Sequence, residues 1–256
     1  MKLGTLALAV ALGAVAVSGA GARPDRAGSA KAAATVYAAA SLTDAFPKIA
    51  PGAKFSFAGS NALATQIRKG APADVFASAN MTLPKALNKD GFCSKPVVFT
   101  RNTLVVIVPK SNPANIHSVY DLRKPGVKVV IAASGVPVGS YTLQVLKNMN
   151  LSAGVLANVV SKETDVREVL AKIALGEGDA GFVYSTDART VPGKVKNVRI
   201  PAWAQPKVQY GICTVSASNN KAAAAAFIKK VLSKKGQKIM RSYGFLPRVK
   251  PKPKKK

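Results

Sequence analysis

Two serines lie where chemistry with an anion is possible: Ser41 in TVYAAASLTDAF (35–46) and Ser60 in FSFAGSNALATQI (55–67). Each follows a short apolar segment and precedes an amphipathic one, which predicts that a strand ends and a helix begins at each serine. The first N–H groups of a helix have no helical partner and carry positive potential, so they favour an anion. Two such serines, followed by GAPADVFAS (70–78), predict a pocket for an oxyanion.

Capping of the helix is the alternative role for each serine. Ser41 and Asp44 even have the spacing of a capping box, in which each side chain bonds a backbone N–H of the other residue. The two roles are compatible, because a hydroxyl group can accept one hydrogen bond while it donates another.

Three segments in the second half of the chain have matching features. In GVPVGSYTLQVL a proline and a glycine shape a turn that leaves the N–H of Val138 free to point outward. In KETDVREVLAKI, Thr164 is the expected N-cap, so Val166 is the second helical residue and its N–H has no helical partner. In GDAGFVYSTDA, Tyr184 ends a strand and its hydroxyl could close the site. A turn, a helix start and a half-buried aromatic residue are the structural alternatives.

Catalytic and metal-binding patterns are poorly supported. The single histidine, His117, lies in a turn, and no GxSxG nucleophile motif occurs. The sequence has no His, Cys and carboxylate cluster with metal-ligand spacing, no P-loop and no GxGxxG. We therefore expect a binding protein without a cofactor or a bare metal ion rather than an enzyme such as an exported serine hydrolase.

Short apolar segments alternate with helical ones along most of the chain, which predicts βαβ units and parallel sheets. The expected strands are 35–39, 54–58, 74–78, 128–133, 158–161, 181–184 and 195–200, with longer strands at 97–109 and 207–216. The expected helices are 42–50, 61–69, 81–89, 139–149, 165–175, 221–232 and 234–243.

These elements predict an α/β fold with two lobes, each a mostly parallel sheet flanked by helices. The lobes are expected at 35–98 plus 217–247 and at 99–216, joined by two crossing hinge strands, 97–109 and 207–216. Ligands of such sheets bind where strands end and helices begin, so the site should lie between the lobes.

The ends of the chain have their own composition. Residues 1–22 have the basic start, small apolar run and small-residue end of a secretory signal peptide, although an uncleaved anchor is an alternative. Residues 23–34 are expected to be a flexible tether and 248–256 a basic disordered tail. An exported protein can keep a disulfide, and Cys93 and Cys213 either form one or are two buried thiols.

The formal net charge is +27, which raises the local concentration of any anion. Proteins that read nucleic acid usually add aromatic platforms or a recognition helix to such charge, and aromatic residues are only 6% of this chain. We expect no specific nucleic-acid partner and a monomeric protein.

The ordered set of motifs resembles the molybdate-binding proteins of ATP-binding-cassette (ABC) molybdate importers. VYAAASLTDAF, FAGSNALATQI, GAPADVFAS, FTRNTLVVIVP, VPVGSYT, TDVREVLAKI, GDAGFVYSTDA and the closing YGF occur in the family's order, from Thr35 to Phe245. The chain departs from the family at Val138, where alanine is frequent, in an apparent extra residue before Val166, and in its basic tail.

The resemblance implies the fold of a periplasmic binding protein, a membrane permease of an ABC importer as partner, and molybdate or tungstate as ligand. It also implies a ligand set: the hydroxyl groups of Ser41, Ser60 and Tyr184 and the backbone N–H groups of Val138 and Val166. Two alternatives remain: a binder of another oxyanion such as sulfate, and a secreted protein that binds polyanions through its basic surface.

Overall fold

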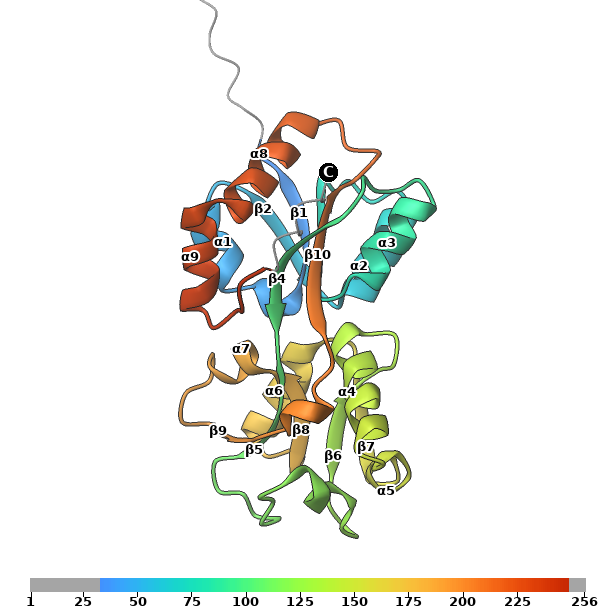
Figure 1. Ribbon diagram of the computed structural model, residues 1–256, viewed down its shortest axis with the longest axis vertical. Helices are drawn as coiled ribbons and strands as arrows, with labels where there is room; N and C mark the ends of the chain where they lie inside the picture. Colours follow the sequence, from blue (N-terminus) through green and yellow to red (C-terminus); the bar gives the residue numbers. More distant parts are fainter. Residues whose placement is uncertain (1–32, 249–256) are drawn as a thin grey trace, which may run out of the picture. The chain divides into compact units, whose positions relative to one another are not determined.

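The computed structural model describes residues 33–248, which form two five-stranded sheets covered by helices (Figure 1). The predicted signal peptide (1–22), nearly all of the tether (23–34) and the basic tail beyond residue 248 lie outside the described residues. Within 33–248, no helix is long and apolar enough to cross a membrane. The predicted fold class is confirmed.

The sheet of lobe 1 has the strand order β2-β1-β3-β10-β4, in which only β10 runs opposite to its neighbours. Its strands are β1 (Thr35–Ala39), β2 (Lys54–Ala58), β3 (Val75–Ser78), β4 (Val97–Asn102) and β10 (Val208–Thr214). Helices α2 (Ser60–Arg68) and α3 (Thr82–Lys89) cover one face. Helices α1 (Ala45–Ile49), α8 (Lys221–Leu232) and α9 (Lys234–Ser242) cover the other (Figure 1).

The sheet of lobe 2 repeats this plan with the order β7-β6-β8-β5-β9, in which β5 is the antiparallel strand. Its strands are β5 (Leu104–Pro109), β6 (Val129–Ala132), β7 (Val159–Glu163), β8 (Ala180–Tyr184) and β9 (Val195–Val198). Its helices are α4 (Pro137–Asn148), α5 (Ser152–Leu156), α6 (Val166–Leu175) and α7 (Ser185–Ala188). Three short 3-10 helices complete the described chain: η1 (Ala40–Leu42), η2 (Val119–Arg123) and η3 (Ala202–Ala204).

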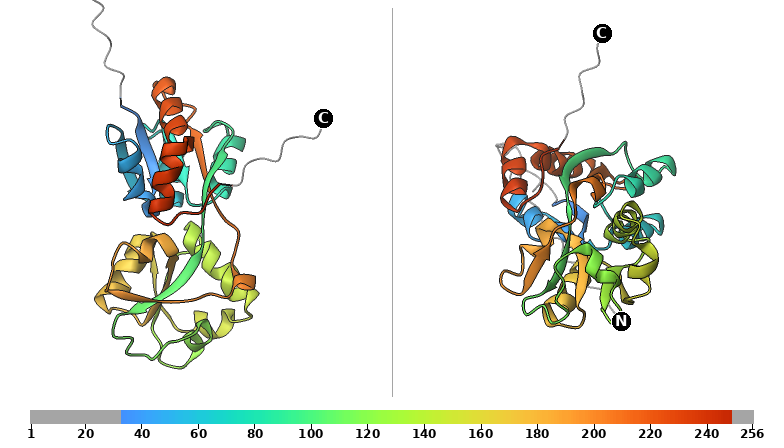
Figure 2. Two further views of the ribbon diagram at one scale, coloured as in Figure 1. Left: turned by 60° about the vertical axis from the view of Figure 1, so that its left-hand side comes forward. Right: turned by 60° about the horizontal axis from the view of Figure 1, so that its bottom comes forward.

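The chain crosses between the lobes twice, once between β4 and β5 and once between β9 and β10 (Figure 2). The side-chain amide of Gln205 joins the two crossings, because its Oε1 accepts from the N–H of Leu104 (3.1 Å) and its Nε2 donates to the carbonyl of Leu104 (2.7 Å). The antiparallel strand of each lobe directly follows a crossing: β5 follows the first and β10 the second.

The sheets differ from the predicted lobe boundaries. The expected single strand 97–109 is interrupted at Thr103, where the chain leaves the first sheet, and β4 and β10 both pair inside lobe 1. Dividing the lobes after residue 98 and after residue 216 therefore assigned β10 and most of β4 to the wrong lobe. The composition of a strand does not show with which sheet it pairs, because that is decided by long-range hydrogen bonds.

Cys93 and Cys213 form a disulfide that ties the segment before β4 to β10. The bond closes a loop with a sequence separation of 120 residues, and a cross-link of that span restricts the unfolded chain strongly. It therefore stabilises the end of lobe 1 away from the crossings, because Cys93 precedes β4 and Cys213 lies near the end of β10.

Candidate anion-binding site

All five predicted site residues line one small cavity between the lobes. Ser41 and Ser60 come from lobe 1, and Val138, Val166 and Tyr184 come from lobe 2. The cavity volume is about 10 Å³, room for about one water molecule. The other lining residues are Ala39, Ala40, Ala58, Gly59, Ala79, Val136, Pro137 and Asp165.

Neither serine caps its helix. Ser60 is the first residue of α2, and its Oγ accepts a hydrogen bond from the backbone N–H of Ala79 (3.1 Å), which follows β3. Ser41 lies in η1, and its Oγ is 2.9 Å from the hydroxyl of Tyr210 on β10. The capping-box pattern of Ser41 and Asp44 is wrong as a capping prediction, because no side chain caps η1 or α1.

Two helix starts supply backbone N–H groups. The N-cap of α4, Val136, has no side-chain hydrogen bond, so the N–H of Val138 at the second helical position has no capping partner. In α6 the N-cap is Asp165 rather than the predicted Thr164, because the Asp165 carboxylate accepts from the N–H groups of Arg167 and Glu168. Val166 is therefore the first helical residue, and its N–H remains without a helical partner.

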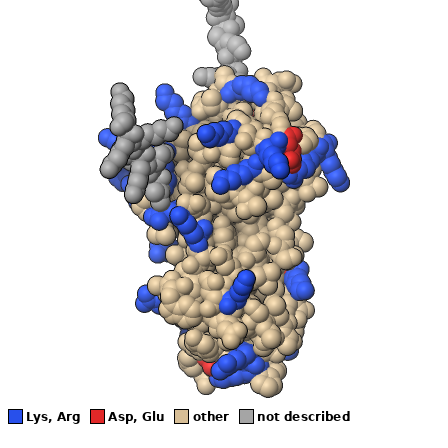
Figure 3. All heavy atoms as spheres, turned by 45° about the vertical axis from the view of Figure 1, so that its right-hand side comes forward, with Lys and Arg blue, Asp and Glu red and all other residues tan. Residues whose placement is uncertain are grey.

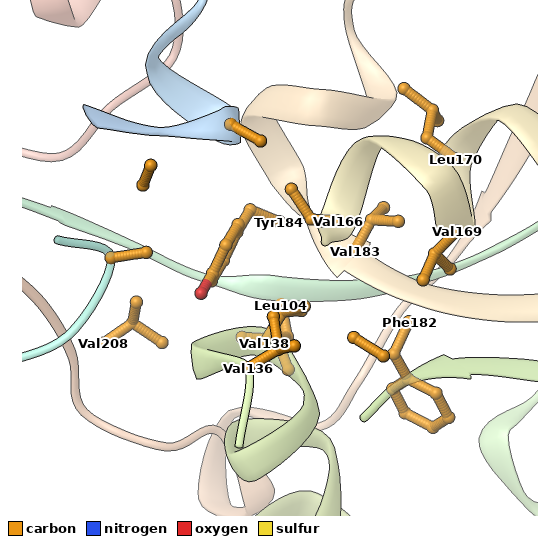
Figure 4. Close-up of a cluster of buried hydrophobic side chains, with 14 of the residues drawn as sticks. Leu104, Val136, Val138, Val166, Val169, Leu170, Phe182, Val183, Tyr184 and Val208 are labelled. Carbon is orange, nitrogen blue, oxygen red and sulfur yellow. The ribbon is translucent and has the colours of Figure 1, made fainter. Parts of the chain in front are cut away.

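The Tyr184 hydroxyl is a buried hydrogen-bond donor without an acceptor in the described part of the chain. Its ring is 1% exposed, and its oxygen has no hydrogen-bond partner among the described residues. Burial raises the pKa of Tyr184 well above its usual value, so the hydroxyl keeps its proton. Tyr184, Val138 and Val166 line the cavity from β8, α4 and α6. Figure 4 shows the side chains of the three residues near one another in the buried cluster. A bound acceptor would satisfy this hydroxyl.

The described residues that line the cavity include no lysine or arginine. They offer neutral donors between apolar walls, and the one carboxylate, Asp165, is turned to the backbone of α6. Among residues 33–248 there is also no group of three or more His, Cys, Asp or Glu side chains that could hold a metal ion. His117 lies in an exposed loop, where its Nε2 is 2.7 Å from Asn115 Oδ1. The arrangement suits an anion that accepts hydrogen bonds.

Beside the cavity, Arg167 joins the two lobes. Its Nη2 is 2.5 Å from Asp44 of lobe 1 and its Nε is 2.8 Å from Asp187 of lobe 2. Burial raises the pKa of Asp187 to about 7, while the charge of Arg167 acts in the opposite direction. The sequence analysis did not identify this group: it considered Asp44 only as a capping partner of Ser41, and Arg167 was not singled out although it follows Val166 directly.

The sequence of this chain matches a known family. The family model of bacterial extracellular solute-binding proteins matches residues 29–246. This chain belongs to that family. The predicted resemblance is therefore confirmed at the level of the family, and the role of the five lining residues in binding stays a prediction.

Named relatives of this solute-binding protein include molybdate-binding proteins. The chain is 39% identical over 220 residues to the molybdate-binding protein ModA of Mycobacterium tuberculosis, covering 82% of this chain and 83% of that protein. It is 35% identical over 228 residues to ModA of Haemophilus influenzae, covering 82% and 89% respectively.

Solved structures share the fold across different ligands. The periplasmic molybdate-binding protein of Azotobacter vinelandii has a TM-score of 0.73 at 23% identity, with 86% of this chain and all (100%) of that chain covered. The sulfate-binding protein SubI of Mycobacterium tuberculosis has a TM-score of 0.72 at 21% identity, with 84% and 86% covered. At these identities the likeness concerns the fold alone, so the fold of this solute-binding protein does not decide its ligand.

Proposed function

We propose that this solute-binding protein captures molybdate, and also tungstate, between its lobes and delivers it to the membrane permease of an ABC importer. The observation that carries the proposal is the cavity, in which two serine hydroxyls, one buried tyrosine hydroxyl and two helix starts meet. The relatives named as molybdate-binding proteins favour molybdate as the ligand.

The proposed mechanism uses neutral donors in place of a charged partner. Each hydrogen bond to a charged group contributes about 1.5–3 kcal/mol, and several would converge on one dianion. Cavity size would favour molybdate and tungstate over the smaller sulfate. Donors alone offer no acceptor for the proton of a hydrogen phosphate, which would disfavour that ion. Closure of the lobes around the ion would be the signal that the permease reads.

The remaining parts of the proposal follow from the same role. The protein would act outside the cytoplasm, in a periplasm or at the outer face of the cell membrane, as a monomer without a cofactor. It would bind rather than transform its ligand, so Ser41 and Ser60 are proposed as ligands and not as nucleophiles.

Calorimetric titration of residues 23–256 with molybdate tests the proposal, with tungstate, sulfate and phosphate as competitors. We expect sub-micromolar binding that excess sulfate does not reverse. Ser60→Ala should weaken binding about 10- to 100-fold, since it removes one hydrogen bond to a charged ligand.

The matched control is Ser233→Ala. Ser233 also accepts a backbone N–H, that of Gly236 (3.0 Å), but it caps α9 far from the lining of the cavity. The Ser233→Ala variant should lower the free energy of unfolding by about 1 kcal/mol and leave molybdate affinity unchanged. Tight sulfate binding would support the oxyanion site but contradict molybdate as its ligand. If no oxyanion bound at all, the whole proposal would be wrong.

Polyanion binding is the second candidate function, because Lys and Arg side chains are spread over the face shown in Figure 3 while Asp and Glu are few. No acidic residue occurs between 217 and 256. Deletion of 248–256 separates the two functions: oxyanion transport requires unchanged molybdate affinity, whereas a polyanion binder should lose affinity for its polymer.

A further inference from the structure

The hydroxyl groups of Ser41 and Tyr210 share one hydrogen bond, and the direction of its proton matters to the cavity. The two oxygens are 2.9 Å apart, and by itself this distance lets either group donate. Ser41 lines the cavity, whereas Tyr210 on β10 does not line it and is completely buried (0% exposed). If Tyr210 donates, the proton of Ser41 is free for a ligand.

Asn102, the last residue of β4, decides the direction. The backbone N–H of Thr103 can only donate, and it lies 2.9 Å from one end of the Asn102 amide, which must therefore be the oxygen Oδ1. The Ser185 hydroxyl donates to the same oxygen (3.0 Å). The amide nitrogen Nδ2 consequently faces Thr186 Oγ1 (2.9 Å) and the Tyr210 hydroxyl (3.3 Å).

Because the amide nitrogen of Asn102 can only donate, the Tyr210 oxygen accepts from it. Burial raises the pKa of Tyr210 well above its usual value, so this hydroxyl keeps its proton and must place it. The Tyr184 hydroxyl lies near that of Tyr210 but makes no hydrogen bond among the described residues, which leaves Ser41 Oγ, 2.9 Å away, as the acceptor for Tyr210. A buried hydroxyl without an acceptor is costly, so Tyr210 donates to Ser41.

We propose that Asn102 and Tyr210 are positioning residues that hold Ser41 as a hydrogen-bond donor toward a bound oxyanion. The inference deepens the proposed function and rests on it. The bonds run in one direction, from Asn102 to Tyr210 to Ser41 to the ligand. Ser60 is prepared in the same sense, because the N–H of Ala79 donates to its Oγ and leaves its proton for the cavity.

The position of Asn102 adds a link to the hinge. Its side chain contacts Thr186 and Ser185 of lobe 2, while its backbone ends β4 of lobe 1. The same amide that fixes the proton on Tyr210 therefore joins the two lobes at a crossing of the chain. The donor state of Ser41 is set from the hinge rather than from its own helix.

A double-mutant cycle of molybdate affinity tests the inference, with the variants Tyr210→Phe, Ser41→Ala and both together. Tyr210→Phe removes only the hydroxyl and should weaken binding about 5- to 10-fold, the effect of one neutral hydrogen bond. In the Ser41→Ala background it should have almost no effect, since Tyr210 acts through Ser41. Tyr120→Phe is the control: Tyr120 is an exposed tyrosine on η2 that does not line the cavity, and loss of its hydroxyl should leave affinity unchanged.

The outcomes separate this inference from the proposed function. If the wild-type protein binds no oxyanion, the proposed function fails, and the inference that rests on it fails with it. If the wild type binds and Ser60→Ala weakens binding, but Tyr210→Phe has no effect or an equal effect in both backgrounds, only the positioning role is overturned. Should Tyr210→Phe not fold, Asn102→Ser replaces it in the same cycle, because it removes the donor to Tyr210 and leaves the tyrosine in place.

Discussion

The Tyr184 hydroxyl shows at the scale of one residue how a ligand site differs from a core. It is buried, protonated and without a partner among the described residues, a condition that costs about 1–3 kcal/mol when nothing is bound. Tyr184→Phe should weaken molybdate binding about 10- to 100-fold, because a donor to the anion is lost. It should not lower the melting temperature of the ligand-free protein, because no protein hydrogen bond is lost.

Titration calorimetry and thermal unfolding of the same variant check this prediction together. If the Tyr184 hydroxyl binds the ligand, the variant loses molybdate affinity and keeps its melting temperature. If the melting temperature fell while molybdate affinity stayed at the wild-type value, the hydroxyl would be structural and our assignment of Tyr184 would be wrong.

Single residues also mark how far the sequence could be interpreted. Ser41 and Ser60 were predicted because the change from strand to helix is a local pattern. Their partners were not, since Tyr210 is 169 residues from Ser41 and the acceptor role of each serine depends on which strands become neighbours. The five lining residues could be predicted, but the groups that orient them could not.

At the scale of elements, the start of α2 packs against the start of α6 with almost no space between them. A Cβ on Gly59, the N-cap of α2, would lie 2.3 Å from the carbonyl oxygen of Thr164, which precedes α6. The backbone of Gly59 (φ −56°, ψ 132°) is one that alanine adopts without strain. Gly59→Ala should therefore leave lobe 1 folded and hold the lobes apart at the cavity.

We expect Gly59→Ala to weaken molybdate binding at least about tenfold, a loss of 1.4 kcal/mol or more, and to leave the melting temperature of the ligand-free protein nearly unchanged. The matched control is Gly52→Ala, because a Cβ at Gly52 meets nothing within 4 Å. Small-angle X-ray scattering with and without molybdate would show the effect directly. If Gly59→Ala bound molybdate like the wild type, contact between these two helix starts would not be needed for binding.

Element boundaries were predicted well where one pattern gave way to another. The strands 35–39 and 54–58 and the helix 221–232 agree with β1, β2 and α8 at both ends. The interruption of 97–109 at Thr103 was missed, although the polar residues 100–103 separate its two apolar ends, because the break comes from the pairing of β4 and β5 with different sheets.

At the scale of the whole described molecule, the ion pair between Asp44 and Arg167 is the one among those found in residues 33–248 that joins lobe 1 to lobe 2. Both side chains are partly exposed (41% for Asp44 and 26% for Arg167), so solvent screens the pair and its contribution is about 0.5–1 kcal/mol. That energy is available only when the lobes are closed. It should therefore slow release of the ligand rather than strengthen the lobes themselves.

Asp44→Asn tests this interlobe ion pair without disturbing Asp187. Replacing Arg167 would leave the buried carboxylate of Asp187 without its cation, and breaking such a buried pair costs about 3–5 kcal/mol. We expect Asp44→Asn to raise the dissociation rate of molybdate about two- to fivefold with little change in the association rate. The wild-type dissociation rate should also rise with salt concentration, and that dependence should be smaller in the variant.

Asp90→Asn is the matched control for stopped-flow measurements. The pair between Arg68 and Asp90 is similar in length (2.9 Å) and exposure, but both residues belong to lobe 1. Its loss should change neither rate, because the pair is present whether the lobes are open or closed. Equal effects of the two variants would mean that surface charge near an anion, and not the bridge between lobes, sets the rate of release.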